Sequence, residues 1–278
     1  MQILTADYVK PDVAEVFVES LKNTGFGVLK NHPIPFELIC DVYQEWENFF
    51  KSDEKFQYLY DKEKQDGYFP YLTENAKDSE QKDLKEFYHY YAWGKYPSHM
   101  SNKTRLLRDQ MSLLASELLQ WIQQLTPDVI KSKFSTPLPN MIYNSPKTLM
   151  RILYYPPLTG SEHKNAVRAA AHEDIDLLTL LPAATATGLQ VKDSQNHWHD
   201  VESDPGTIII NAGDMLQMCS DYYYCSTTHQ VINPIDESAK KPRLSMPLFL
   251  HPKDEVILST KHTAKSYLKE RLQELGLV

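Results

Sequence analysis

Apolar residues recur at helical spacing in four segments of the chain, 11–24, 35–52, 101–125 and 261–277. In the third, one apolar face is traced by Leu106, Leu107, Leu113, Leu114, Leu118, Trp121 and Leu125. Short strands are expected within 25–32 and near 86–93, the latter inside an otherwise irregular, aromatic region. The pattern therefore predicts an N-terminal half dominated by helices and a helix at the C-terminal end.

From residue 147 onward the pattern changes to short apolar runs separated by Pro, Gly and Asn. These runs are "TLMRILYYPP", "LLTLLPA", "GLQVKD", "WHDVES", "GTIIINAG", "MLQMCS", "STTHQVIN" and "RLSMPLFLHP". Several short strands at regular spacing are typical of a sandwich or barrel. We therefore divide the chain into an N-terminal region (1–100), a long helix with its connector (101–146) and a β core with a terminal helix (147–278).

The charge and composition of the chain disfavour several classes of protein. The 278 residues carry a net charge of −8 and no basic stripe, which disfavours a nucleic-acid partner. The three cysteines, Cys40, Cys219 and Cys225, are widely spread and predict neither a disulfide framework nor a zinc site. No signal peptide or membrane-length apolar run is visible, so we expect a soluble, cytoplasmic protein that does not bind membranes.

The stretch "RAAAHEDIDLLTLL" places charged residues against a run that should be buried, which is costly unless something compensates the charge. On a strand, His172 and Asp174 would share one face while Glu173 points the other way. A third ligand could come from His229, which lies 57 residues later in a run of mostly uncharged residues. Two histidines and one carboxylate form the facial triad of non-haem Fe(II) oxygenases.

The same histidines also fit roles that involve no metal. A lone strand histidine is usually a hydrogen-bonded structural residue, and an H-x-D pair is common by chance. His197 and His199 also have ligand-like spacing, but they lie in a polar segment that predicts a hairpin. "HEDID" lacks the second histidine of the helical zinc motif H-E-x-x-H.

Arg243 and Ser245, in "KPRLSMPLF", are also two residues apart and should face one side of a strand. An inward guanidinium needs an anion, and its fork of donors matches a carboxylate. Adjacent strands could present Arg243 and His229 together, since fourteen residues separate them. The alternative is an arginine paired with an acid of the protein itself.

Together these motifs resemble the isopenicillin N synthase-like branch of the Fe(II)/2-oxoglutarate-dependent oxygenases (the iron/ascorbate oxidoreductase family). The resemblance extends from "GFGVLKNHPI" and "DLKEFYHYY" through "HEDIDLLTLL" and "GLQVKD" to "PRLSMPLFLHP". It implies a mainly β fold with helices, in which N-terminal helices, a long helix and a C-terminal helix surround a double-stranded β-helix, or jelly roll. The region 1–100 would be the non-haem dioxygenase N-terminal region.

The resemblance implies that His172, Asp174 and His229 bind Fe(II), and that Arg243 and Ser245 hold the distal carboxylate of the co-substrate 2-oxoglutarate. Tyr155 matches a tyrosine that commonly contacts co-substrate or substrate. Two positions depart from the family pattern. Leu153 replaces an asparagine two residues before that tyrosine, and Asp176 replaces a small residue. Glu173 and Asp176 are expected to face elsewhere, toward solvent or toward other partners.

The implied reaction consumes O2 and 2-oxoglutarate, releases succinate and CO2, and hydroxylates, desaturates or cyclises a small organic substrate. One alternative is a relative that takes its electrons from the substrate or from ascorbate. Another is a non-catalytic jelly-roll binding protein, whose triad would be expected to be broken. The sequence identifies neither the substrate nor the oligomeric state.

The substrate pocket is expected to include Phe249 and Val231, which lie on the inner face by strand alternation. The aromatic segment "DLKEFYHYYAW" is the expected lid, contributing Tyr88 or Tyr90 and His89. The alternative for this segment is plain packing of a strand on the barrel.

Overall fold

The computed structural model describes residues 1–74, 81–202 and 204–274, and two β-sheets form its centre. The large sheet has the strand order β1-β2-β10-β7-β13-β5-β4-β3, and β12 also pairs with β5. The small sheet has the order β6-β11-β8-β9. These two sheets correspond to the jelly-roll core that the sequence predicts.

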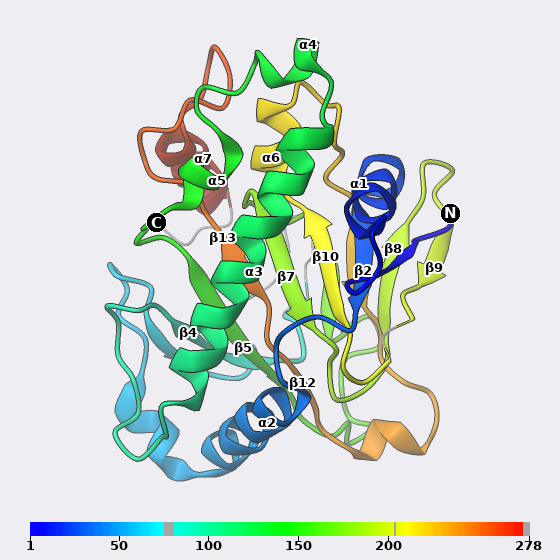
Figure 1. Cartoon of the computed structure of the whole chain (residues 1–278). Helices are drawn as coiled ribbons and strands as arrows, with labels where there is room; N and C mark the ends of the chain where they lie inside the picture. Colours follow the sequence, from blue (N-terminus) through cyan, green and yellow to red (C-terminus); the bar gives the residue numbers. More distant parts are fainter. Residues whose placement is uncertain (75–80, 203, 275–278) are drawn as a thin grey trace.

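The helices lie mainly before and after the β core (Figure 1). Their bounds are α1 Val13–Thr24, α2 Phe36–Lys51, α3 Lys103–Leu125, α4 Asp128–Lys131, α5 Leu138–Ile142, α6 Asp214–Cys219 and α7 Ala264–Glu274, with 3-10 turns η1 Asp53–Tyr58 and η2 Glu237–Lys240. The strands of the large sheet are β1 Thr5–Asp7, β2 Phe26–Lys30, β3 Gly67–Phe69, β4 Glu86–Tyr90, β5 Leu149–Tyr155, β7 Leu178–Pro182, β10 Ile208–Ala212, β12 Arg243–Ser245 and β13 Leu248–Leu250. Those of the small sheet are β6 Ala169–His172, β8 Leu189–Lys192, β9 Trp198–Asp200 and β11 His229–Val231.

The N-terminal region is built into the large sheet. Strand β2 pairs with β10 along one side, and β4 pairs with β5 over five residue pairs on the other. Helices α1, α2 and α3 lie together on the outer face of this sheet, with α3 running across it (Figure 1). The first hundred residues thus supply both an outer helical layer and strands that extend the core.

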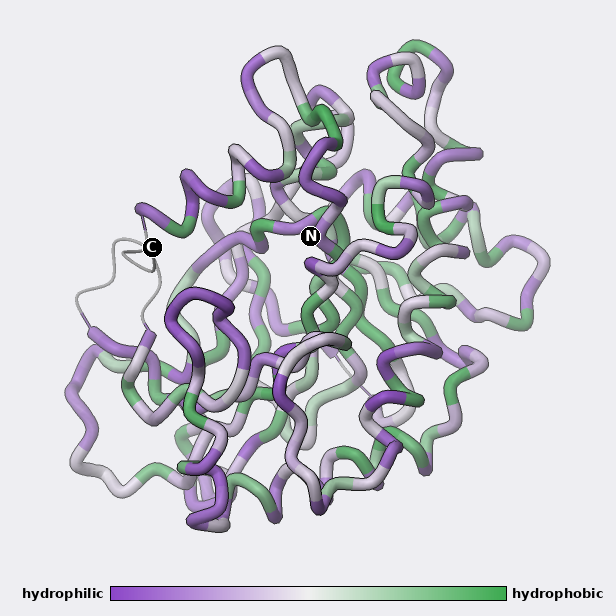
Figure 2. Tube along the Cα trace, turned by 90° about the vertical axis from the view of Figure 1, so that its left-hand side faces the viewer, coloured by the Kyte–Doolittle hydropathy of each residue, from purple (hydrophilic) through white to green (hydrophobic). Residues whose placement is uncertain are grey.

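The main hydrophobic core fills the space between these helices and the large sheet. Trp46 of α2 is completely buried there, packs against Phe49 and Tyr88, and donates its indole N–H to the hydroxyl of Thr104 over 3.0 Å. A second cluster of buried apolar residues, which includes Phe26, lies between the two sheets. Apolar stretches accordingly concentrate in the interior while the outer loops are mostly hydrophilic (Figure 2).

Two features differ from the sequence-based expectations. The run 215–220 is predicted to be a strand, but residues 215–219 belong to helix α6 and Ser220 caps its end, because a short apolar run has no decisive period. The expected apolar face of α3 is partly wrong: Leu106, Leu113 and Leu125 are exposed, and the buried face includes Met111 instead. The predicted end of the C-terminal helix, 275–277, lies outside the described residues.

No helix in the described part of the chain combines the length and the apolar character that crossing a membrane requires.

The buried face of α3 gives a matched test of the packing. Leu118 is fully buried, whereas Leu113 on the same helix is 74% exposed. Leu118→Ala should lower the free energy of unfolding by about 2–5 kcal/mol, since it removes buried methyl groups and leaves a cavity. Leu113→Ala should change it by less than about 0.5 kcal/mol. Urea unfolding of both variants checks this, and equal effects would contradict the packing described.

Candidate active site

Two histidines face each other across the small sheet. His172 is the last residue of β6, His229 is the first residue of β11, and the two are cross-strand partners in an antiparallel pair. Their ring centroids are 4.4 Å apart. Asp174 follows β6, just past the end of the strand rather than on it, where the chain turns toward β7. The structure therefore brings together all three residues that the sequence proposed as metal ligands.

The hydrogen bonds of the three side chains leave one donor atom of each free for an ion. Nδ1 of His172 contacts the carbonyl of Ala170 at 2.8 Å, and Nδ1 of His229 contacts the carbonyl of Thr227 at 3.1 Å. Each Nε2 then faces Oδ1 of Asp174, at 3.8 and 3.7 Å respectively. Among the described residues, this is the one group of His, Cys, Asp or Glu whose ligand atoms lie close enough together to hold a metal.

The second carboxylate oxygen of Asp174 is fully occupied. Oδ2 accepts hydrogen bonds from the hydroxyl of Thr179 at 2.6 Å and from the side-chain amide of Asn211 at 2.8 Å. Such partners behind a ligand fix its orientation and tune its affinity. Thr179 and Asn211 lie opposite each other on the paired strands β7 and β10, so the large sheet orients the ligand that joins the two histidines of the small sheet.

The electrostatics suit a cation. Burial lowers the pKa of His172 to about 4, and the nearby His229 acts in the same direction. At neutral pH the imidazole is therefore uncharged and offers its Nε2 lone pair. Burial by itself would raise the pKa of Asp174, but His229, His172 and the two hydrogen bonds from Thr179 and Asn211 bring it below its usual range. The result is a buried carboxylate beside two imidazoles.

Asp176 faces partners within the protein rather than solvent, which is one of the two orientations expected from the sequence. It is completely buried, and its Oδ2 lies 3.0 Å from the amide of Leu250 and 3.1 Å from Oγ1 of Thr179. Burial, followed by the charge of Asp174, raises the pKa of Asp176 well above its ordinary value. The hydroxyl of Thr179 therefore lies within hydrogen-bond distance of both carboxyl groups, with the shorter contact to Asp174.

The close packing around Asp176 explains a glycine in the chain. A Cβ on Gly213 would lie 2.2 Å from Oδ1 and 2.3 Å from the carbonyl oxygen of Asp176. The backbone amides of Asp214 and Met215 bind the carbonyls of Asp174 and Asp176 at 2.8 and 2.9 Å. The segment 213–215 therefore clamps the loop that carries the carboxylate ligand, and only glycine fits at its first position.

Glu173 is exposed at the rim of the pocket beside the cluster, which agrees with the expectation that it faces solvent or another partner. Its carboxylate accepts a hydrogen bond from the hydroxyl of Thr228 over 2.7 Å, which ties the end of β6 to the start of β11. His197 and His199 lie on the hairpin of β8 and β9, as the polar sequence indicated. His199 contacts Asp193 at 2.7 Å there, and neither histidine belongs to the metal cluster.

Arg243, Ser245 and Tyr155 come together where β12 pairs with β5. Arg243 is directly opposite Tyr155, and its guanidinium carbon is 5.2 Å from the centre of the tyrosine ring. All three side chains are buried, and Nη1 of Arg243 has no hydrogen-bond partner in the protein. Leu153, opposite Ser245, is buried as well and contributes no polar group to this end of the barrel.

A pocket of about 390 Å³ opens beside the metal cluster. Phe249 lines it, as expected, but Val231 lies instead in the apolar cluster between the sheets. Strand β4 lines the pocket with His89, as expected, but not with Tyr88 or Tyr90. Tyr88 and Tyr90 are buried in the outer core, whereas His89 and Tyr91 line the pocket.

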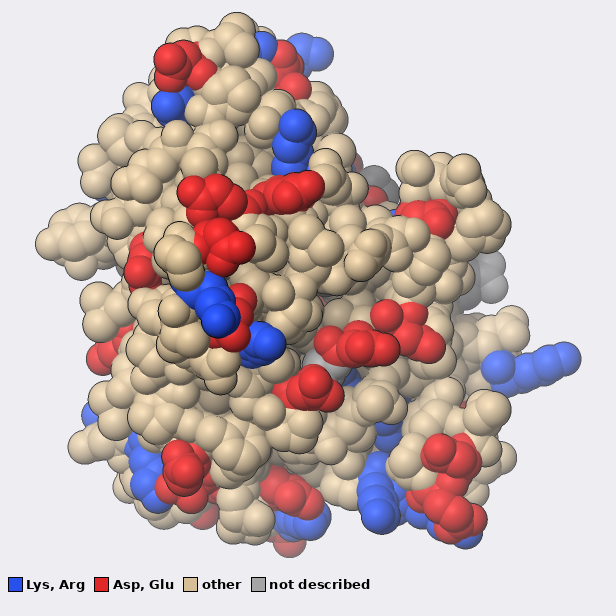
Figure 3. Space-filling view, turned by 45° about the vertical axis from the view of Figure 1, so that its right-hand side comes forward, with Lys and Arg blue, Asp and Glu red and all other residues tan. Residues whose placement is uncertain are grey.

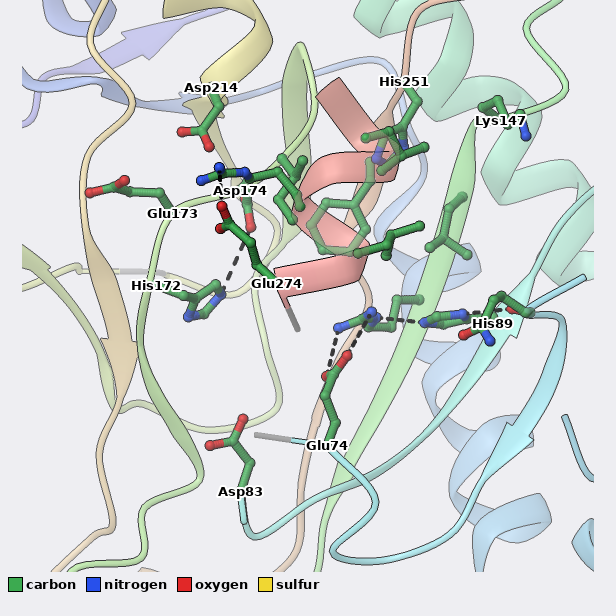
Figure 4. Close-up of a pocket in the computed structure, with 18 of the residues that line it drawn as sticks. Glu74, Asp83, His89, Lys147, His172, Glu173, Asp174, Asp214, His251 and Glu274 are labelled. Carbon is green, nitrogen blue, oxygen red and sulfur yellow. Dashed lines mark hydrogen bonds and ion pairs between the residues drawn. The ribbon is translucent and has the colours of Figure 1, made fainter. Parts of the chain in front are cut away.

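The wall of the pocket holds a charged network that the sequence did not reveal. Arg151 of β5 binds Glu74 through Nη1 and Nη2 at 3.1 and 3.4 Å and donates from Nε to His89 at 2.8 Å (Figure 4). Its guanidinium lies over the rings of Phe87 and Phe249. The sequence signal that could have indicated this network is the presence of His89 and Arg151 among the aromatic and apolar residues of β4 and β5. The sequence could not show that they pair with each other and with Glu74, because the three residues come from separate segments.

Helix α7 closes another side of the pocket with Leu268, Arg271 and Leu272. Tyr267 of the same helix donates a hydrogen bond to Asp214 over 2.7 Å, which links α7 to the clamp around the metal cluster. The sequence predicted this helix but gave no indication that it faces the site. The amphipathic pattern does not specify which surface a terminal helix covers.

The hydrogen bond from Thr179 to Asp174 yields a test that leaves all three ligands intact. Thr179→Val keeps the shape of the side chain but removes the donor to Oδ2 of Asp174. We expect roughly 10- to 100-fold weaker binding of a divalent metal, measured by calorimetry with Mn(II). Thr148→Val, at a buried threonine outside the cluster, is the control. Unchanged affinity in the first variant would contradict the orienting role.

Comparison with known families gives matches to both halves of the chain. Residues 146–252 match the 2OG-Fe(II) oxygenase superfamily, and residues 2–110 match the family described as non-haem dioxygenase in morphine synthesis N-terminal. A flavonol synthase/flavanone 3-hydroxylase of Matthiola incana is 26% identical over 275 residues, covering 92% of this chain and 88% of that protein. The Arabidopsis thaliana enzyme of the same name is 28% identical, covering 92% and 77%.

Solved structures agree with this assignment. A candidate oxygenase from Shewanella oneidensis is 52% identical, with complete coverage of both chains and a TM-score of 0.91. A full-length Neurospora crassa protein in complex with alpha-KG shares the fold at 22% identity, with coverage of 97% and 95% and a TM-score of 0.79. The chain belongs to the 2OG-Fe(II) oxygenase superfamily, and it is a dioxygenase that depends on Fe(II) and 2-oxoglutarate.

Proposed function

We propose that His172, Asp174 and His229 hold the Fe(II) ion, and that Arg243 and Ser245 bind the distal carboxylate of 2-oxoglutarate. The observation that supports the metal site best is the orientation of its donors. Two Nε2 atoms and Oδ1 of Asp174 face one another while every other polar atom of the three side chains is already bonded. A two-histidine, one-carboxylate set is the ligand combination of non-haem Fe(II).

At the co-substrate end, what supports the proposal is the state of Arg243. Its side chain is buried, Nε donates to the carbonyl of Ala186 over 3.0 Å, and Nη1 lacks a partner. A carboxylate would supply the missing acceptor through charge-assisted hydrogen bonds. Ser245, on the same face of β12, adds a hydroxyl, and the ring of Tyr155 packs against the guanidinium.

When bound, Fe(II) and 2-oxoglutarate supply the O2-dependent oxidation, with release of succinate and CO2. The residues of the chain orient the reactants for it. Thr179 and Asn211 hold the carboxylate of Asp174, and Arg243 fixes one end of the co-substrate. The adjoining pocket would place an organic substrate beside the cluster, between Phe249 and helix α7. Its volume of about 390 Å³ suits a small molecule.

We propose a small organic molecule as substrate, rather than a nucleic acid. The net charge is −8, and acidic and basic side chains are interspersed on the face shown in Figure 3. Two finer assignments are also proposals. Free Cys40, Cys219 and Cys225 support a cytoplasmic location, and the R-x-S motif supports the isopenicillin N synthase-like branch.

Replacing the histidine ligands tests the metal site. His172→Ala and His229→Ala should each abolish tight iron binding and activity, because each removes one of three protein ligands. Metal analysis of anaerobically loaded protein gives the iron content. His197→Ala and His199→Ala, on the β8–β9 hairpin, should retain full occupancy. Full occupancy in the first two variants would rule out the assignment.

Replacing Arg243 tests the co-substrate site separately. Arg243→Leu should raise the apparent constant for 2-oxoglutarate by roughly 30- to 150-fold while iron is retained, since a charge-assisted contact is lost. Succinate formation at varied 2-oxoglutarate provides the measurement. Lys241→Leu, which removes an exposed cation two residues away, should leave the constant unchanged. An unaltered constant in Arg243→Leu would place the co-substrate elsewhere.

A further inference from the structure

A second arginine lies beside Arg243 in the interior of the protein. Arg168, immediately before β6, is 1% exposed and Arg243 is 2% exposed, and both are among the largest fully buried side chains. Both guanidinium carbons lie over the same ring, that of Tyr155, at 6.0 and 5.2 Å. The two sheets therefore each bring one arginine to the same tyrosine.

Neither arginine is neutralised by the protein. No ion pair joins Arg168 or Arg243 to an acid anywhere in the described ranges. Arg168 donates from Nη2 to the carbonyl of Lys241 at 3.3 Å, while its buried Nε has no partner, and Nη1 of Arg243 has none either. Two buried like charges with free donors are strongly unfavourable unless an anion binds between them.

We propose that Arg168 is a second co-substrate-binding residue, which acts with Arg243 on the distal carboxylate of 2-oxoglutarate and makes the enzyme selective for 2-oxo acids with a second carboxylate. This rests on the proposed role of Arg243. Two guanidinium groups can bind the two oxygens of one carboxylate from different sides, which neutralises part of the buried charge. A 2-oxo acid without the distal carboxylate would leave both arginines unpaired, so it should bind poorly.

The burial of the pair explains why selectivity should be high. Discrimination by a polar site is strong when an analogue leaves buried donors unsatisfied, because their desolvation is then uncompensated. A single surface arginine could be rehydrated by water, whereas these two side chains are almost inaccessible. The carbonyls of Lys241 and Ala186 hold one nitrogen of each arginine, so the guanidinium groups are held before the ligand arrives.

The test is binding of two probes to the Fe(II)-loaded enzyme, measured by anaerobic calorimetry. The probes are 2-oxoglutarate and 2-oxopentanoate, which has the same chain length but lacks the distal carboxylate. Arg168→Met should weaken 2-oxoglutarate binding roughly 10- to 100-fold and change 2-oxopentanoate binding by less than about 3-fold. Iron content should stay at the wild-type level, and Lys164→Met, which removes an exposed cation four residues before Arg168, is the control.

Arg168→Lys keeps a charge but loses the fork of donors, so it should lie between wild type and Arg168→Met in its preference for 2-oxoglutarate. This second variant also serves if Arg168→Met does not fold. An unchanged preference in Arg168→Lys, or equal weakening of both probes in Arg168→Met, would overturn the proposal. If Arg168→Met binds 2-oxoglutarate with wild-type affinity while Arg243→Leu binds it weakly, Arg168 has no role in binding and the role of Arg243 still holds. If Arg243→Leu also binds 2-oxoglutarate with wild-type affinity, the proposed co-substrate site is itself wrong.

Discussion

The antiparallel pairing of β6 with β11 is the constraint on which the site depends. It places His172 directly opposite His229, and the chain then turns so that Asp174 lies against both rings. A buried carboxylate needs partners, and these come from a different sheet, through Thr179 and Asn211. The candidate metal site therefore lies where the two sheets of the jelly roll meet. A shift of one residue in either strand would turn a histidine to the opposite face.

Buried charge is distributed over two separate regions around this centre. On the pocket side, Arg151 is neutralised by Glu74, and Lys85 contacts both Glu74 and Asp83 at 3.0 and 2.8 Å. At the other end, Arg168 and Arg243 have no acid beside them in the described chain. The first network is complete without a ligand, so it shapes the substrate wall. The second has free donors, which is the arrangement expected where an anionic co-substrate binds.

Local sequence patterns were sufficient for most elements and insufficient where both faces of a segment are buried. Strand β4 illustrates the limit. Its residues Phe87, Tyr88, His89 and Tyr90 are all aromatic, so no alternation distinguishes the pocket face from the face that packs on α2. The segment 215–220 was misassigned for a related reason, because an apolar run of this length fits a strand or a short buried helix.

The sequence by itself determined the candidate ligand types, their order along the chain, the arginine–serine pair and a β core of the sandwich or barrel type, and the resemblance of its motifs to an oxygenase family implied the jelly roll. These features depend on residue identity and on spacing within single segments, which a linear pattern records. Only the tertiary structure decided that Asp176 is a buried acid behind the cluster, that α7 covers the pocket, and that Arg168 joins Arg243. The physical reason is that a buried polar group is defined by its partners, and those partners come from segments far apart in the chain.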